Sequence, residues 1–455
     1  MKRILIIIAY ALASLVVIIA TILLVAYGQG YSYDFATKRF IVIGQIFLNS
    51  TPSGSKIYLG TKLLGKNTPS RLSLEPKDYQ LSVQKTGYQD WKKILTVRPG
   101  EVTFAQYIWL FPNEIKTDLM TSDKQNVVKF IPSPSKHKFA YFSTGENPGL
   151  WVLDASNRQQ NKLYTPTAGE SLLNARWSND SAKLLLETKI QSRLTWRYIS
   201  LQSQSDNFNI TDSFKYDFND LQFNPLNTKQ LYWVSPEGLR LLDLNTKTVS
   251  SVQIDNLITY IFAADKILYV QKTLHGNSLW SLDRAGNKQK IIQSLPDSSS
   301  YQLNYGNYNG KDLLAVGITT HQSVTLYSDI FGPNMVSKIL SKTVSKSIFN
   351  PKNNLLTFYD DNFGGTYDIE KDQIYSFNLH SQKINNPIWL DNFHLLMNSV
   401  GCIYVVEYDG DNLTKLINSV NGFFAYPIDG KGNVLIIQNL ANSTNRGLLL
   451  AHLKP

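Results

Sequence analysis

The segment Leu150-Trp151-Val152-Leu153-Asp154 decides the fold, because segments of the same kind return at a regular distance along the chain. Each copy is an apolar run that ends on a polar residue and follows an aromatic turn, an apolar strand and a polar loop. Seven intervals between Asp154 and His452 span 298 residues, about 43 each. This period is typical of β-propeller blades, which are four-stranded sheets that cannot bury both faces alone. The other copies are residues 196–200, 239–243, 279–283, 324–328, 374–378, 403–407 and 449–453.

The count of copies favours eight blades between residue 113 and residue 455. Seven blades are the main alternative, because Ser328, Asn378 and Glu407 are separated by 50 and then 29 residues. An aromatic residue stands just before a turn in four copies, at Trp177, Phe223, Phe349 and Trp389. In this respect residues 113–455 resemble the β-propellers related to WD-repeats and to the periplasmic protein of the Tol system. The individual motifs are degenerate, so the resemblance is one of architecture.

The closure of the ring can also be predicted. The last copy ends at its third strand, with only Lys454 and Pro455 left over, so the eighth blade lacks an outer strand. We expect residues 113–120 to pair there, because this removes an exposed sheet edge.

A smaller strand module precedes the propeller. Residues 44–112 alternate apolar and polar positions, and short intervals rich in Gly, Pro and Ser separate the runs. This pattern predicts an all-β domain of about 70 residues.

The residues of this module resemble the PEGA domain in order and spacing. Ser55 stands where the family usually has Ala, and Lys77 stands where a turn Gly is usual, so we expect Lys77 to adopt a turn conformation. The resemblance implies a small β-sandwich and an envelope protein of a prokaryote. It rests on residues 50–55, 58–60, 64–65, 68–69, 72–74, 76, 79, 85–88 and 91.

The N-terminal segment is apolar enough to predict a membrane-spanning helix. Residues 4–27 are an apolar run of 24 residues, which as a helix is about 36 Å long and exceeds a hydrocarbon core of roughly 30 Å. We expect residues 1–28 to be a signal-anchor helix, with Lys2 and Arg3 in the cytoplasm and a juxtamembrane linker at residues 29–43. A cleaved signal peptide is the alternative, although its apolar region usually spans about 7–15 residues. Both interpretations place the remaining chain outside the cytoplasm, the first as a single-pass protein of the cell membrane.

Charge and cysteine content limit the partners. The net charge of +10 belongs mostly to residues 1–112, which hold 13 basic and 5 acidic residues. These basic residues match no nucleic-acid motif, so we expect an envelope protein or a wall polysaccharide as partner and no nucleic acid. The single cysteine, Cys402, excludes a disulfide framework and a multi-cysteine metal site.

One segment of the chain is unusually rich in carboxylates. Propellers usually bind ligands at the face that carries the loops between second and third strands. There, residues 360–372 contain five carboxylates, which we name as a candidate ligand-binding loop: Asp360, Asp361, Asp368, Glu370 and Asp372. The loop is rich in oxygen and glycine and could hold Ca²⁺, but it lacks EF-hand spacing and more often such a loop is simply solvated. We assign no cofactor and no metal.

No catalytic residue is assigned either. The chain has no GxSxG nucleophile motif and no paired metal-binding histidines. The composition therefore favours an anchored binding or scaffold protein over an enzyme. A surface glycoside hydrolase or lyase with two carboxylates meeting at the propeller mouth stays open as the alternative.

Overall fold

The computed structural model describes residues 2–34, 38–283, 289–377, 385–399, 401–420, 423–428, 432–441 and 443–454. The chain divides into two compact units. Unit 1 comprises Met1–Ile115 and Leu453–Pro455, and unit 2 comprises Lys116–His452. Each unit is considered by itself below.

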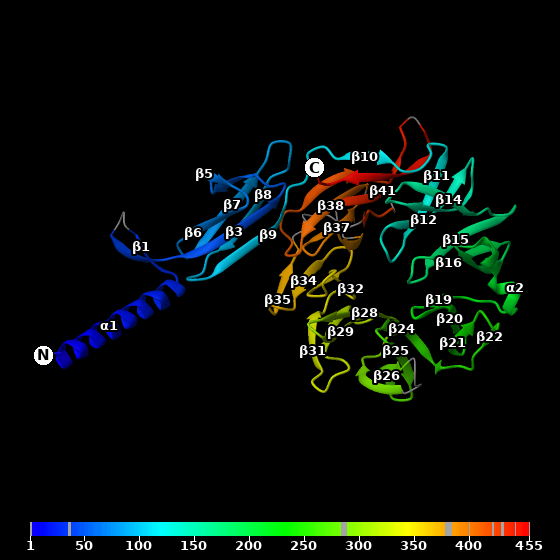
Figure 1. Cartoon of the computed structure of the whole chain (residues 1–455). Coiled ribbons are helices and arrows are strands. Elements are labelled where there is room, and N and C mark those ends of the chain that lie inside the picture. Colours follow the sequence, from blue (N-terminus) through cyan, green and yellow to red (C-terminus); the bar gives the residue numbers. More distant parts are fainter. Residues whose placement is uncertain are drawn as a thin grey trace. The chain divides into compact units, whose positions relative to one another are not determined.

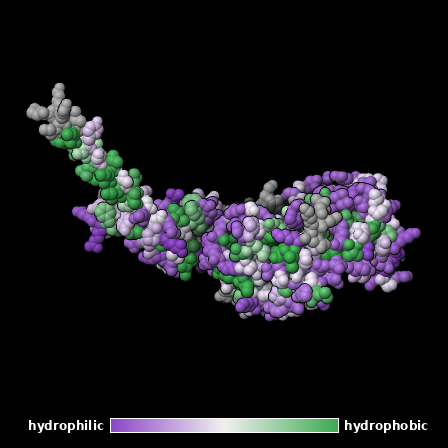
Figure 2. All heavy atoms as spheres, turned by 90° about the horizontal axis from the view of Figure 1, so that it is seen from below, coloured by the Kyte–Doolittle hydropathy of each residue, from purple (hydrophilic) through white to green (hydrophobic). Residues whose placement is uncertain are grey.

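Unit 1 begins with helix α1 (Lys2–Gly28), whose side chains are exposed along most of its length. Among the described residues, one helical stretch, Tyr10–Gly28, is long and apolar enough to cross a membrane, a property that signal sequences share. Figure 2 shows hydrophobic atoms along this helix. The hydroxyl of Thr21 donates to the Val17 carbonyl at 2.8 Å, so this polar group is satisfied within the helix. The helix therefore meets the main requirement of a membrane span.

A two-stranded hairpin follows the helix. Strand β1 (Tyr31–Asp34) pairs antiparallel with β2 (Arg39–Val42), and no third strand joins this sheet among the described residues. The segment expected to be a linker thus contains regular structure. Gly30 and Gly100 have positive φ and lie against each other, and a Cβ on Gly30 would stand 2.4 Å from the Gly100 nitrogen. This close approach joins the end of the helix to the domain that follows.

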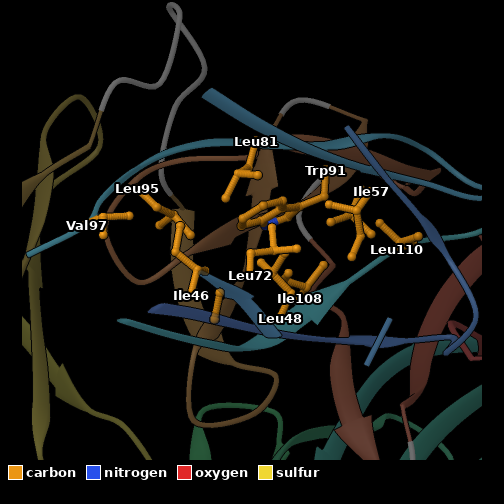
Figure 3. Close-up of a cluster of buried hydrophobic side chains, with 12 residues drawn as sticks. Ile46, Leu48, Ile57, Leu72, Leu81, Trp91, Leu95, Val97, Ile108 and Leu110 are labelled. Carbon is orange, nitrogen blue, oxygen red and sulfur yellow. The ribbon is translucent and has the colours of Figure 1, made fainter. Parts of the chain in front are cut away.

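The module after the hairpin is a β-sandwich, as the alternation predicts. One sheet has the order β6-β3-β9 and the other β5-β4-β7-β8. Figure 3 shows side chains of both sheets converging on Trp91, which is 2% exposed. The strands are β3 (Gly44–Thr51), β4 (Lys56–Leu59), β5 (Lys62–Asn67), β6 (Ser70–Leu74), β7 (Asp78–Gln84), β8 (Trp91–Thr96) and β9 (Val102–Trp109).

The two departures from the PEGA pattern have simple outcomes. The Ser55 hydroxyl is buried and donates to the Pro52 carbonyl at 2.8 Å, so it is satisfied where the family usually has Ala. Lys77 is not among the described residues with positive φ, and its ammonium lies 5.2 Å from the Tyr79 ring centre. The chain bends at Pro76 and Lys77, as expected, but Lys77 does so without the left-handed backbone that favours glycine.

Unit 2 is a β-propeller of eight blades. Its described strands form eight sheets, seven of four strands and one of five, which follow one another around a ring (Figure 1). Blades 1 to 4 contain β11 (Gln125–Pro132), β12 (Lys138–Gly145), β13 (Gly149–Asp154), β14 (Gln159–Tyr164); β15 (Glu170–Trp177), β16 (Lys183–Ile190), β17 (Arg193–Ser200), β18 (Phe208–Asn209); β19 (Leu221–Asn224), β20 (Asn227–Ser235), β21 (Gly238–Asp243), β22 (Thr248–Val249), β23 (Ile254–Asp255); and β24 (Leu257–Ala263), β25 (Lys266–Thr273), β26 (Gly276–Asp283), β27 (Gln289–Leu295). In blade 2, η1 (Gln204–Asp206) precedes the outer strand β18, and α2 (Ile210–Phe214) follows it.

The remaining blades complete the ring. Blades 5 to 8 contain β28 (Tyr301–Tyr308), β29 (Lys311–Ile318), β30 (Ser323–Ser328), β31 (Val336–Ser341); β32 (Lys346–Phe349), β33 (Leu355–Tyr359), β34 (Gly364–Asp368), β35 (Gln373–Ser376); β36 (Asn385–Trp389), β37 (His394–Ser399), β38 (Cys402–Glu407), β39 (Thr414–Asn418); and β40 (Tyr426–Ile428), β41 (Asn433–Asn439), β42 (Arg446–His452), β10 (Lys116–Leu119). Strand β10 pairs antiparallel with β42, from Lys116 opposite His452 to Leu119 opposite Leu449. The predicted closure by residues 113–120 is therefore confirmed. One buried cluster, which includes Phe139 of blade 1 and Leu435 of blade 8, joins the two ends.

The predicted position of the third strand is wrong in blade 6. The sixth copy was expected at residues 374–378, but the third strand of that blade is β34 and residues 373–376 form the outer strand β35. Asn378 lies outside the described residues. With Asp368 in its place, the intervals from Ser328 and to Glu407 become 40 and 39 residues. The error arose because Gly364-Gly365-Thr366 carries too little apolar character to mark a strand, although β34 is buried throughout.

The aromatic residue before a turn has a structural role. The Trp177 indole donates to the Ile131 carbonyl of blade 1 at 3.0 Å, and the Trp389 indole lies 3.5 Å from the Ile348 carbonyl of blade 6. Each indole thus satisfies a backbone oxygen on the inner strand of the neighbouring blade. The motif holds adjacent blades in register.

Candidate functional site

The five carboxylates of residues 360–372 do not form one loop. Asp360 and Asp361 lie in the turn between β33 and β34, whereas Glu370 and Asp372 lie in the turn between β34 and β35. The five residues of β34 separate the two turns by roughly 17 Å, at about 3.3 Å per residue. The expectation of a single acidic loop is therefore wrong, and the Ca²⁺ site that it suggested loses its geometry. Among the described residues, no group of three or more His, Cys, Asp and Glu side chains could hold a metal.

Three of these carboxylates support local structure. Asp360 accepts hydrogen bonds from the Asn362 and Phe363 amides at 2.7 Å each, which closes its turn. Asp361 forms an exposed ion pair with Lys346 at 3.8 Å. Asp368 is 4% exposed and accepts from the Glu370 amide at 3.0 Å. None of the three lines the cavity that contains Glu370 and Asp372.

Glu370 and Asp372 line a cavity of about 730 Å³ between blades 5 and 6. Its walls come from the turn between β28 and β29, the start of β31 and the turn between β34 and β35. The cavity therefore lies at the end of the blades opposite to the loops where we expected a ligand. It is lined by Tyr308, Asn309, Lys311, Leu313, Leu326, Ser328, Val336, Ser337, Lys338, Tyr367, Ile369, Glu370 and Asp372.

Three of the charged side chains in the cavity, Lys338, Glu370 and Asp372, have partners on the neighbouring blade. Lys338 of blade 5 forms an ion pair with Asp372 of blade 6, and the Tyr367 hydroxyl donates to the same carboxylate at 2.6 Å. The Lys338 ammonium also lies 4.7 Å from the centre of the Tyr367 ring. The Tyr308 hydroxyl donates to Glu370. These contacts hold the side chains in place before any ligand arrives.

The ionisation of this cluster follows from the contacts. Hydrogen bonds from Lys338 and Tyr367 lower the pKa of Asp372, and the hydrogen bond to Asp372 raises the pKa of Lys338. Burial, followed by the bond to Asp372, raises the pKa of Tyr367. At neutral pH Lys338 and Asp372 are therefore a fixed cation and a fixed anion in the cavity wall, beside the phenol rings of Tyr308 and Tyr367. Such a lining suits hydrogen bonding and stacking with a polar ligand.

Sequence reasoning missed half of this cavity. Tyr308 and Glu370 are 62 residues apart, and Lys338 and Asp372 are 34 residues apart. Tyr308, at the end of the inner strand of blade 5, and Lys338, in its outer strand, carry no motif of their own. Only the correct blade register would have brought them beside the turn that contains Glu370 and Asp372.

Two charged groups of the opposite loops are paired within their own blades. Glu146 forms an ion pair with Lys124 at 3.5 Å, and Arg193 lies 3.6 Å from Asp212. These pairs are exposed and belong to separate blades, so they do not converge on one reacting position.

Two further carboxylates bear on the enzyme alternative. Glu187 of β16 and Asp220, which precedes β19, belong to a cluster with Lys129 and Arg176 in blades 1 to 3. Burial raises the pKa of Glu187, and the Asp220 charge raises it further while Arg176 lowers it. Asp220 forms an ion pair with Arg176. The cluster is thus balanced by its own cations.

Comparisons with known proteins bear on the PEGA domain and on the propeller fold. The family model of the PEGA domain matches residues 43–108. Among similar solved structures, dipeptidyl peptidase 4 of Porphyromonas gingivalis has 10% identity and a TM-score of 0.50, over 72% of this chain and 58% of that chain. The Dos1 propeller has 12% identity and a TM-score of 0.48, over 74% of this chain and 97% of that chain. A prolyl endopeptidase has 11% identity and a TM-score of 0.47, over 74% of this chain and 55% of that chain.

These likenesses concern the fold alone, because the identities are so low. The match spans little more than half the length of the two peptidases. No curated protein sequence matches the chain. The chain carries an N-terminal apolar helix, a PEGA domain and an eight-bladed β-propeller.

Proposed function

We propose that this chain is a single-pass membrane protein whose PEGA domain and propeller lie outside the cytoplasm and bind a partner in the cell envelope. Helix α1 supplies the anchor, since it is long enough to span and its side chains are exposed. The PEGA domain supports an envelope location. The propeller supplies a rigid body with a large surface, a common arrangement for recognition.

The cavity between blades 5 and 6 carries the proposal. Lys338, Asp372 and Glu370 already have partners, and the phenols of Tyr308 and Tyr367 are already positioned, so a ligand does not have to order these side chains. Preorganisation of this kind lowers the entropic cost of binding. We assign the cavity to a hydroxyl- or amide-bearing segment of an envelope protein or a wall polysaccharide, because phenol faces and charge-assisted hydrogen bonds suit both.

The enzyme alternative has less support. Hydrolysis of a glycoside needs two carboxylates on either side of the bond, and the cavity holds its carboxylates in contacts with Lys338, Tyr367 and Tyr308. Glu187 and Asp220 are a second pair of neighbouring carboxylates that the alternative could use.

The test compares full-length protein in detergent with two variants in capture of separated wall polymer and of solubilised envelope proteins. Lys338→Ala breaks the pair with Asp372, so we expect at least a tenfold loss of capture. Lys346→Ala is the matched control, because it breaks the exposed pair with Asp361 within blade 6, outside the cavity. We expect no change in this variant.

Two results would contradict the proposal. Equal capture by the two variants would show that the cavity does not bind the partner. Hydrolysis of a glycan or peptide library by the wild type, abolished in Glu187→Gln, would establish the enzyme in place of the binding protein.

A further inference from the structure

The hairpin β1–β2 has one aromatic face. Tyr31 lies opposite Val42 and Tyr33 lies opposite Phe40 in the antiparallel register. Directly opposite residues share a face of the sheet, so these four side chains form one surface, which we call the aromatic face. The rings of Tyr33 and Phe40 meet edge to face, with centroids 5.2 Å apart.

The rings of this face are partly or mostly exposed to solvent. Phe40 is 72% exposed, Tyr31 47% and Tyr33 40%. A two-stranded sheet is marginally stable in water by itself, and no further strand pairs with it among the described residues. The hairpin therefore leaves the Phe40 ring mostly exposed and the rings of Tyr31 and Tyr33 partly exposed.

The position of the hairpin points to a particular occupant. Helix α1 ends at Gly28 and β1 begins at Tyr31, so the hairpin starts within about 10 Å of the end of the span. The Ile43 amide donates to the Gly30 carbonyl at 2.7 Å, and the Gly100 amide donates to the Ile43 carbonyl at 2.9 Å. These bonds, with the close approach of Gly30 and Gly100, hold the hairpin beside the helix end.

The chemistry of the hairpin matches a bilayer surface. Aromatic rings concentrate at the membrane–water interface, where an apolar body and a polar edge are both accommodated. Tyr27 at the end of the helix is 72% exposed and continues the aromatic surface. Lys38 and Arg39 are exposed at the turn and the start of β2, where lipid phosphates would attract them.

We infer that the aromatic face of β1–β2 docks on the outer leaflet of the membrane, in the headgroup region of phospholipids, and so fixes the PEGA domain against the bilayer. The inference rests on the proposed anchoring by α1 and extends it, because a helix alone would leave the domain free to tilt. It also explains why regular structure occurs in a segment that composition suggests is a linker.

Spin-label accessibility tests this inference on the full chain in phosphatidylcholine–phosphatidylglycerol nanodiscs. The Cys402→Ser background leaves one introduced cysteine at a time. Phe40→Cys reports on the aromatic face, and Ile41→Cys on the opposite face of the same strand is its matched control. Ile94→Cys, on an exposed position of β8, gives the aqueous reference, and Leu15→Cys in α1 gives the membrane reference.

We expect the ratio of oxygen to nickel-chelate accessibility at position 40 to exceed that at position 94 several-fold, with position 41 closer to position 94. Transfer from nanodiscs to a lipid-free amphipol should lower the ratio at position 40. Equal ratios at 40, 41 and 94 would overturn the inference while a high ratio at 15 leaves the anchor intact. A low ratio at 15 would instead overturn the anchoring on which the inference rests.

Discussion

Thr68 shows how a short sequence motif becomes a buried hydrogen-bond network in the PEGA domain. Its hydroxyl lies 2.6 Å from the Ser50 hydroxyl and accepts from the Ser55 amide at 3.0 Å. All three residues are buried. The serines and the threonine of the motif therefore have a structural explanation in their own mutual contacts.

Replacing Thr68 with Val keeps the shape of the side chain but leaves the Ser55 amide without its acceptor. An unsatisfied buried donor costs about 1–3 kcal/mol, so we expect the free energy of unfolding to fall by that amount in a urea titration. Thr61→Val, at an exposed turn position, is the matched control and should change little. A loss equal to the control would show that the network contributes no stability.

Glu170 gives a prediction for pH dependence. Burial by itself raises the pKa of this carboxyl, but hydrogen bonds from the Thr167 amide, the Tyr164 hydroxyl and other donors outweigh burial and hold it at about 2. The pKa is thus lower in the folded than in the unfolded chain. Its contribution to stability is complete above about pH 4.5 and is lost as the pH falls toward 2.

The size of this effect is up to about 3 kcal/mol, at about 1.4 kcal/mol for each pKa unit. Glu170→Gln should unfold more easily at pH 6 and lose less stability than the wild type between pH 5 and pH 2. Glu146→Gln, whose carboxylate is exposed, should keep the wild-type slope. Identical slopes for wild type and Glu170→Gln in urea titrations would refute this assignment.

At the scale of elements, β10 closes the ring by pairing with β42. We expect replacement of residues 116–119 by glycine and serine to lower the melting temperature of the propeller, because β42 would then have an unpaired edge. The same replacement at residues 319–322, an exposed loop of equal length, is the control. Equal melting temperatures for the two variants in a calorimetric scan would show that the pairing of β10 with β42 contributes no measurable stability to the propeller.

The elements also show what the sequence could predict. Apolar runs ending on a polar residue marked the third strand of seven blades correctly, because those strands are buried between neighbouring blades and need large side chains. In blade 6 the strand contains Gly364 and Gly365, and a Cβ on Gly365 would lie 2.7 Å from the Tyr375 carbonyl oxygen. Close packing at this position requires glycine. The strand therefore lacks the large apolar side chains from which the repeat is predicted.

At the scale of the whole chain, composition and period were sufficient for the order of helix, sandwich and propeller, but not for the cavity. The cavity exists because Lys338 and Tyr308 of one blade meet Asp372 and Glu370 of the next. Contacts of this kind depend on the rotation between blades. A repeat length alone does not specify which outer turns face each other.

The central claim is that the cavity between blades 5 and 6 recognises an envelope partner, and a photo-crosslinker tests it most directly in intact cells. One full-length variant carries the crosslinking amino acid at Val336, which lines the cavity and is 62% exposed. The other carries it at Leu226, which is 68% exposed on blade 3, away from the cavity. We expect a discrete adduct from position 336 that is lost in Lys338→Ala, and none from position 226. Absence of an adduct at 336, or equal adducts at both positions, would contradict the claim.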